Sequence, residues 1–122
     1  MLEQEKVEDY IRSHKLSHTE WCDICQYYKL SESIMREYAD EIEWYWVCCR
    51  QRLSEKFMRE FPQKLWIMEV FKYQEITPAF ADWLVAVDGE VDDHRMSSIC
   101  NLLKNKWGIV FDKDLGRFRW MD

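Results

Sequence analysis

The sequence predicts a mainly α-helical fold, in which short helical hairpins repeat and stack as a small solenoid before a C-terminal helix and β-hairpin. The first observation is an internal repeat of 23 residues: the stretch 30–38 (LSESIMREY) recurs at 53–61 (LSEKFMREF) and begins again at 76–80 (ITPAF). The second is the spacing of apolar residues by three and four within each copy, which marks one face of a helix. Stacked repeats bury such faces against their neighbours.

Each copy is expected to begin with a helix whose first turn is capped by a hydroxyl side chain, namely Ser31, Ser54 or Thr77. This hydroxyl accepts a hydrogen bond from a backbone N–H that has no partner within the helix. Pro78 follows the third cap, at a position where the N–H that proline lacks is not needed. The segment 2–15 carries Val7 and Ile11 in the same phase, which predicts the helix of a degenerate first copy.

A second helix is expected in each copy. It begins after Ser17 in the first copy, where Ser17 and Glu20 have the spacing of a capping box. Asp40 and Gln63 stand at the corresponding positions of the next two copies and predict N-caps there. The buried face of these helices is predicted from three sets of residues in equal phase: Trp21, Trp44 and Ile67; Ile24, Val47 and Val70; Cys25, Cys48 and Phe71.

The repeat pattern fades in its fourth copy, which divides the chain into a repeat region at 1–87 and a C-terminal region at 88–122. In the second region, Asp92 predicts a helix N-cap and Gly108 predicts the end of that helix. Two short apolar and aromatic segments flank a turn that ends at Gly116, which predicts a β-hairpin. The two regions are expected to form one compact domain.

Composition limits the classes of function. The formal net charge of −6 argues against an overall basic surface for nucleic acid or anionic membrane, and it suits a basic protein partner. The N-terminus lacks the pattern of a secretory signal, and no apolar run approaches membrane-spanning length. We therefore expect a cytoplasmic protein without membrane association, whose five cysteines are reduced thiols.

No catalytic constellation emerges from the sequence. There is no Ser/His/Asp set, no paired-carboxylate pocket and no glycine-rich phosphate loop, and the chain has only three glycines. We therefore expect no enzyme activity and no cofactor.

The Cys-x-x-Cys formed by Cys22 and Cys25, with His14 and His18 upstream, is a pattern typical of zinc sites. On one helix these four residues would span about 16 Å, since each residue rises about 1.5 Å. One ion with bonds of about 2 Å does not reach that far, although a bend at Ser17 would shorten the span. The spacing therefore favours structural cysteines, and we expect no metal site.

Two tryptophans break the repeat pattern. Trp46 and Trp66 occupy phases that hold acidic residues in other copies. Exposed aromatic side chains carry much of the binding energy of protein interfaces. We expect Trp46 to be exposed, whereas a one-residue slip in the helix would bury Trp66. Both are candidate partner-binding residues.

Acidic residues crowd the middle copies, and the candidate partner-binding residues among them are Glu37, Glu41 and Glu43. The simplest interpretation is a solvated helical face. The functional alternative is an acidic surface that competes with nucleic acid for a basic groove on the partner. The two interpretations differ in whether these acids gather on one side of the stack.

The phrase at 53–61, Leu-Ser-Glu-x-Phe-x-Arg-Glu-Phe, continues to Val70, Tyr73 and Gln74. It resembles the short tandem LSEEFI-type helical repeats of phage and large-virus proteins. The resemblance implies a phage-type scaffold that contacts protein in a bacterial host cell, and that repeat class has no shared catalytic residues to carry over.

This resemblance covers roughly residues 7–83, and the first copy departs from it with His14 and Lys15 where the others carry acidic and aromatic residues. The expected function is binding to a host or defence protein, and a basic nucleic-acid-binding protein suits the acidic charge. Such binding would inhibit or modulate that protein, and an anti-CRISPR-like inhibitor is one form of it.

The tail is similar to the last helix and wing of a winged-helix domain, and it is the most basic part of the chain, with Lys104, Lys106, Lys113, Arg117 and Arg119. This resemblance implies an alternative function as a nucleic-acid-binding regulator, with Lys104, Arg117 and Arg119 as candidate contacts. A third alternative is a homo-oligomeric structural protein in which another copy caps the open end of the stack.

Overall fold

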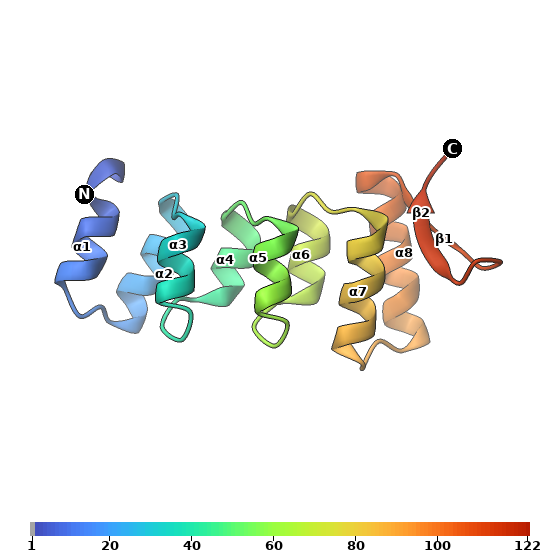
Figure 1. Cartoon of the computed structure of the whole chain (residues 1–122), viewed down its shortest axis with the longest axis horizontal. Coiled ribbons are helices and arrows are strands. Elements are labelled where there is room, and N and C mark those ends of the chain that lie inside the picture. Colours follow the sequence, from blue (N-terminus) through green and yellow to red (C-terminus); the bar gives the residue numbers. More distant parts are fainter. Residues whose placement is uncertain (1) are drawn as a thin grey trace.

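The computed structural model describes residues 2–122 and is mainly helical, with a two-stranded antiparallel sheet at the C-terminus (Figure 1). Within these residues a 3₁₀ turn, η1 (Gln4–Lys6), precedes eight α-helices and two strands. The elements are α1 (Val7–Ser13), α2 (His18–Tyr27), α3 (Glu32–Glu37), α4 (Trp44–Arg50), α5 (Glu55–Glu60), α6 (Ile67–Tyr73), α7 (Pro78–Asp88), α8 (Asp93–Trp107), β1 (Ile109–Asp112) and β2 (Arg117–Trp120). No helix in residues 2–122 combines the length and the apolarity needed to cross a lipid bilayer.

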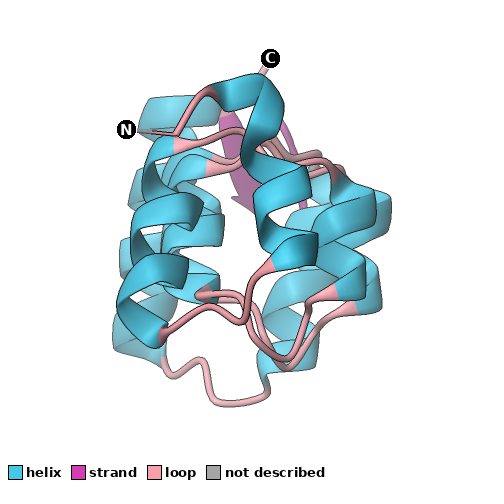
Figure 2. Ribbon diagram, turned by 90° about the vertical axis from the view of Figure 1, so that its left-hand side faces the viewer, coloured by secondary structure: helices cyan, strands magenta, loops and turns pink. Residues whose placement is uncertain are grey.

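The helices follow one another along the long axis of the molecule, from the N-terminus at one end to the β-hairpin at the other (Figure 1). Seen along that axis, the helices lie in two layers joined by loops at both ends (Figure 2). In the layer of even-numbered helices, α2 packs against α4, α4 against α6, and α6 against α8. The hairpin closes this end, because β1 packs against α8 and β2 against α7.

The predicted hydroxyl caps are confirmed. Ser31, Ser54 and Thr77 each accept a hydrogen bond from the backbone N–H three residues later, at the start of α3, α5 and α7. At α2 the full capping box is present: the N–H of Glu20 donates to the Ser17 hydroxyl at 3.2 Å, and the N–H of Ser17 donates to the Glu20 carboxylate at 3.1 Å. Each cap needs only residues three apart, so local sequence is enough to predict it.

The predicted N-caps Asp40 and Gln63 are wrong. Helices α4 and α6 begin three residues later than these positions require. Before α4, the indole N–H of Trp44 donates to the carbonyl of Ala39 at 2.8 Å, and the indole ring packs against Phe57 of the next copy with 6.0 Å between ring centroids. A contact between copies thus accompanies a turn at a place where local sequence predicts a helix.

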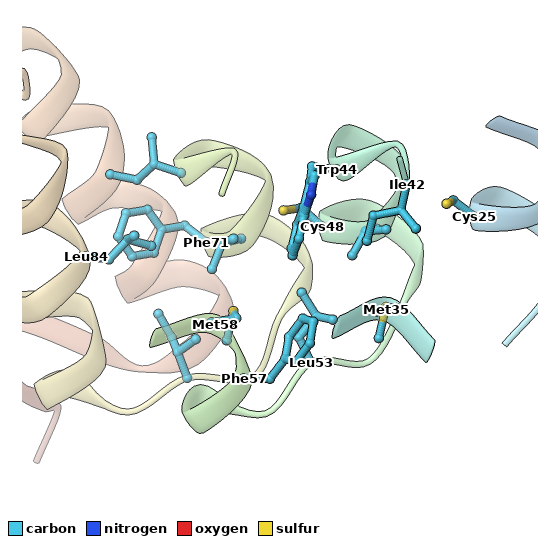
Figure 3. Close-up of a cluster of buried hydrophobic side chains, with 14 of the residues drawn as sticks. Cys25, Met35, Ile42, Trp44, Cys48, Leu53, Phe57, Met58, Phe71 and Leu84 are labelled. Carbon is cyan, nitrogen blue, oxygen red and sulfur yellow. The ribbon is translucent and has the colours of Figure 1, made fainter. Parts of the chain in front are cut away.

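The predicted buried face is confirmed, and it forms one core along the molecule (Figure 3). Cys25, Cys48 and Phe71, which share one phase, are all fully buried. The C-terminal region joins the same core through buried residues of α8 and both strands: Ile99, Leu103, Ile109 and Phe118. The expected division between residues 87 and 88 falls at the last residue of α7, Asp88, and no separate core lies on either side of it within residues 2–122.

Two buried glutamines connect successive copies. The Gln74 side chain accepts a hydrogen bond from the N–H of Leu53 at 3.0 Å and donates to the carbonyls of Cys48 at 2.9 Å and Gln51 at 2.7 Å. Gln51, one copy earlier, accepts from the N–H of Leu30 at 2.9 Å and donates to the carbonyls of Cys25 and Tyr28 in the preceding copy. Each amide therefore satisfies three backbone groups at the point where one copy turns into the next.

The aromatic end of α8 continues this pattern at the last copy. The indole N–H of Trp107 donates to the carbonyl of Phe71 at 2.7 Å, and Phe71 has the phase of the Cys48 carbonyl that Gln74 binds. Trp107 therefore replaces a glutamine as the donor at this position, which ties the tail to the repeats.

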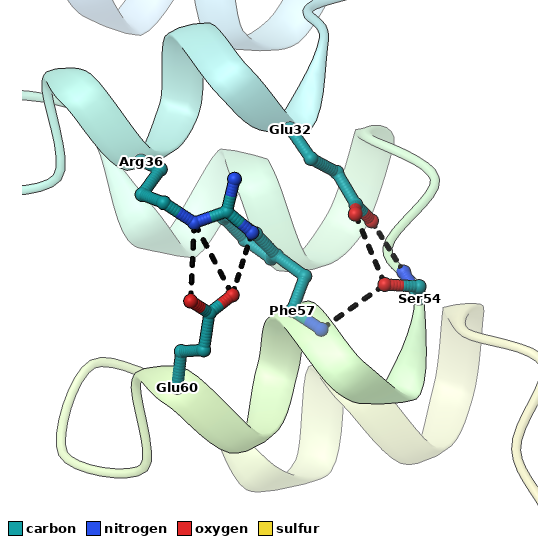
Figure 4. Close-up of polar contacts among 5 residues, drawn as sticks. All are labelled: Glu32, Arg36, Ser54, Phe57 and Glu60. Carbon is teal, nitrogen blue, oxygen red and sulfur yellow. Dashed lines mark hydrogen bonds and ion pairs between the residues drawn. The ribbon is translucent and has the colours of Figure 1, made fainter.

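Carboxylates of one copy bind the caps of the next. The Glu32 carboxylate accepts from the Ser54 N–H at 2.7 Å and from its hydroxyl at 3.0 Å, and that hydroxyl in turn accepts from the N–H of Phe57 (Figure 4). In the same view the Arg36 guanidinium makes an ion pair with Glu60 at 2.6 Å. Glu55 binds the cap of α7 in the same way, through both the N–H and the hydroxyl of Thr77. Glu8 accepts from the N–H of Ser31 at the cap of α3.

Candidate protein-binding surface

An aromatic cluster, defined here as Tyr45, Trp46 and Trp66, joins the start of α4 to the start of α6. The Tyr45 ring meets both indole rings edge to face, with 5.1 Å between centroids in each pair and interplanar angles of 82° for Trp46 and 84° for Trp66. Edge-to-face contact is the arrangement that aromatic quadrupoles favour. The two tryptophans that break the repeat pattern are therefore held together by one tyrosine.

The two tryptophans differ in exposure. Trp66 is 49% exposed at the N-cap of α6, outside the first helical turn. Trp46 is half-buried, packs against the core and lies 5.9 Å from the Arg50 guanidinium, so the expectation that it is exposed is not met. The slip that would bury Trp66 does not occur, because this indole stands before the helix and Ile67 occupies the buried position.

A surface groove of about 420 Å³ lies between the C-terminal ends of α4 and α6, the loop 51–54 and the end of α8, and no residue of the aromatic cluster lines it. Its lining includes Cys49, Arg50 and the exposed Tyr73. The ammonium group of Lys106 lies 5.1 Å from the centroid of the Tyr73 ring and 5.5 Å from that of Trp107. Sequence analysis missed this groove, although Tyr73 stands in the phase of the exposed Tyr27 and could have indicated it.

The three acidic candidates do not form a common patch with the tryptophans. Glu37 makes an ion pair with Arg12 at 3.5 Å, and Glu41 is exposed in the turn between α3 and α4. Glu43 is half-buried at the N-cap of α4, 3.6 Å from His18. The neighbouring acids Glu32, Glu55 and Glu60 bind groups of the next or preceding copy. Much of the acidic character therefore serves the stacking of copies.

The basic candidates of the tail are only partly available. Lys104 and Lys113 are exposed and line a groove of about 750 Å³ between α8 and β1, and Arg117 is exposed nearby at the start of β2. Arg119, in contrast, makes an ion pair with Asp112 at 2.9 Å across the hairpin. The backbone N–H of Leu115 and this guanidinium hold the pKa of Asp112 below its usual range.

The buried cysteines are not activated thiols. Burial raises the pKa of Cys25 to about 11 and that of Cys48 to about 12. A nucleophilic cysteine needs a lowered pKa, which opposite charges or a helix N-terminus supply. These two thiols therefore act as small core residues.

Among residues 2–122 one group of side chains could hold a metal ion, and it differs from the set of His14, His18, Cys22 and Cys25. His18, Cys22 and Glu43 each offer a ligand atom, and these atoms lie within 4.8 Å of one another. Cys25 is buried in the core, and His14 stacks on the Tyr10 ring at 4.0 Å between centroids. The histidine and cysteine spaced by four residues were visible in the sequence, but the glutamate comes from the next copy.

Comparison of the chain with protein-family models, with curated proteins and with solved structures gives no significant match.

Proposed function

We propose that this protein is a small protein-binding scaffold, a short α-solenoid of phage-type repeats that binds a host or defence protein in the bacterial cytoplasm and inhibits or modulates it. An anti-CRISPR-like inhibitor is one form of this function. The repeated contacts between copies support the scaffold, and the LSEEFI-type repeat phrase supports its phage-type origin.

The observation that carries the proposal is the exposed indole of Trp66, held edge to face against Tyr45. An aromatic side chain that already has a fixed orientation loses little conformational entropy when a partner covers it. Tryptophan and tyrosine are also enriched among the residues that dominate interface energies. The groove at the C-terminal ends of α4 and α6 supplies a concave surface elsewhere on the same two helices.

The net charge supports a basic partner. A chain of formal net charge −6 attracts positively charged proteins at long range. Because many of its acids are engaged between copies, we assign the charge a role in steering encounter and the aromatic cluster the role of holding the complex. A nucleic-acid-binding protein of the host fits this description.

The test is an affinity pull-down of the tagged full chain from bacterial lysate, with and without nuclease, comparing Trp66→Ala with wild type. The matched control is Trp120→Ala, which removes an indole of similar exposure, 54%, from the hairpin instead. Circular dichroism would verify that both variants keep their helical content. We expect recovery of a specific protein whose binding persists after nuclease treatment. Trp66→Ala should weaken this binding about 30-fold or more, and Trp120→Ala should leave it unchanged.

Other outcomes would reject the proposal in favour of one of the alternatives. Recovery of nucleic acid alone, lost after Lys104→Glu and Arg117→Glu, would favour the regulator with a winged-helix-like tail. A mass that grows with protein concentration, without any other bound protein, would favour the homo-oligomeric structural protein.

A further inference from the structure

We propose that His18, Cys22 and Glu43 form a binding site for Zn²⁺, or for a transition-metal ion of similar preference, that links α2 to α4. The site joins the first copy of the repeat to the second. It lies apart from the aromatic cluster and does not depend on the proposed partner.

The ligands are placed by secondary structure. His18 is the first residue of α2 and Cys22 follows one turn later, so that both side chains project from one face of the helix. Glu43 is the N-cap residue of α4, which packs against α2. Its carboxylate makes no hydrogen bond with the first turn of α4 and points instead to His18.

The distances are close to those of a metal site. Cys22 Sγ lies 3.5 Å from His18 Nε2, and a Glu43 oxygen lies 3.6 Å from His18 Nδ1. Tetrahedral zinc with bonds of about 2.0–2.3 Å places its ligand atoms about 3.3–3.8 Å apart. One nitrogen of His18 has to serve the ion, and the side chain is 79% exposed, so its ring can turn to aim that nitrogen at an ion shared with Cys22 and Glu43. The ligand atoms of the three side chains already lie within 4.8 Å of one another.

The chemistry of the ligand set selects the ion. A thiolate, an imidazole and a carboxylate are all zinc ligands, whereas calcium and magnesium prefer oxygen ligands alone. Three protein ligands leave a fourth tetrahedral position, which water fills at this exposed site. Binding requires the thiolate, so the Cys22 proton leaves to solvent as the sulfur–metal bond forms.

The local charges favour a cation. The Glu43 carboxylate lies 3.6 Å from His18 Nδ1, and Asp23 follows Cys22 directly on α2. These two carboxylates oppose a negative sulfur when no cation is present. A divalent ion reverses this balance, because it is the largest charge in the site and attracts all three negative groups.

The repeat itself marks the site as unusual. Cys22 has the phase of Tyr45, and Glu43 has the phase of Trp66. Between α4 and α6 these two phases hold the edge-to-face aromatic contact at 5.1 Å. Between α2 and α4 the same two places hold a thiol and a carboxylate, with an imidazole beside them. A metal bridge supplies at the first interface the cohesion that aromatic rings supply at the second.

The test is a titration of the reduced full chain with Co²⁺, a spectroscopic substitute for zinc. We expect one equivalent to give a thiolate-to-cobalt charge-transfer band and the visible bands of tetrahedral cobalt, both removed by one equivalent of Zn²⁺. The variant Cys22→Ser should abolish the charge-transfer band. His18→Gln and Glu43→Gln should each weaken binding about tenfold or more, because each removes one of three ligands.

The matched control is Cys49→Ser, which removes another half-buried thiol, on α4. This variant should keep the full signal. The proposal is overturned if the band is absent, if it persists in Cys22→Ser, if it is lost in Cys49→Ser, or if its strength shows that two chains share one ion. Because a substitution could disturb folding, the thermal midpoint of wild type is measured as well, and it should rise with Zn²⁺ and stay constant with Mg²⁺.

Discussion

The interface between α2 and α4 and the interface between α4 and α6 share one interior and differ at the surface. Inside, Gln51 and Gln74 make corresponding hydrogen bonds to the backbone on both sides of the junction between two copies. Outside, the first interface carries the potential metal ligands and the second carries the contact between Tyr45 and Trp66. The repeat therefore preserves the groups that join copies, while the outer positions differ from one interface to the next.

The largest expected effect tests the shared interior. Replacing Gln51 or Gln74 by Met keeps the side-chain volume but leaves three backbone groups without partners, one N–H and two carbonyls, near the core. We expect each substitution to lower the free energy of unfolding by about 4 kcal/mol, since each unsatisfied buried group costs about 1–3 kcal/mol. Urea unfolding measures this change.

The control for this pair is Gln63→Met, at an exposed position in the turn before α6, which should leave stability within about 0.5 kcal/mol of wild type. A loss at only one of the two buried glutamines would show that the two interiors are not equivalent.

A smaller effect is expected for the coupling energies between side chains at the surfaces of the two interfaces. A double-mutant cycle with Tyr45→Ala and Trp66→Ala should give a coupling energy of about 1 kcal/mol, typical of an edge-to-face aromatic pair. The corresponding cycle with Cys22→Ala and Glu43→Ala should give about zero in the presence of a chelator. With Zn²⁺ added, the second coupling should rise to at least about 1 kcal/mol. If the coupling energy of Cys22 and Glu43 were the same with chelator and with Zn²⁺, the expected difference between the two interfaces would be contradicted.

The smallest expected effect is the pH dependence of the ion pair between α3 and α5. The Arg36 guanidinium hydrogen-bonds to Glu60 and holds the pKa of that carboxyl below its usual range. A lowered folded-state pKa contributes stability above the unfolded pKa of about 4.3, and this contribution disappears as the pH falls through the folded value. The gap in thermal midpoint between wild type and Glu60→Gln should therefore close on acidification below about pH 4.3.

The next copy offers the control for this titration. There Trp83 takes the place of Glu60, and the Arg59 guanidinium lies 5.0 Å from the centroid of the Trp83 ring and 5.3 Å from that of Phe80. Because these rings do not titrate, the effect of Arg59→Gln should not change over the same pH range. A gap for Glu60→Gln that stays constant down to pH 3 would show that the ion pair contributes nothing.

Much of the fold could be predicted from sequence, because its signals are local. The hydroxyl caps of α3, α5 and α7, the capping box at Ser17, and the end of α8 at Gly108 each depend on residues within one or two helical turns. The start of α4 could not be predicted in the same way. Asp40 offers a good local cap, but the Trp44 side chain is engaged with Ala39 and with Phe57 of the next copy.

The candidate surface was predicted only in part. The break in phase at Trp46 and Trp66 was visible in the sequence, and Trp66 is exposed. Which of the two indoles would be covered depends on Tyr45, whose ring contacts both, and on the later start of α6. The candidate metal site was not predicted, because the sequence argument considered only residues along one helix, from His14 to Cys25. Glu43 lies in the next copy and was outside that argument.

The sequence by itself determined the period of 23 residues, the apolar faces and the caps of the first helix in each copy, because each follows from spacing along one chain segment. The tertiary structure alone decided what Gln51, Gln74 and Trp107 bind, and which side chains meet at Glu43. These contacts join residues about one repeat or more apart, so their geometry is fixed only when one copy packs against the next.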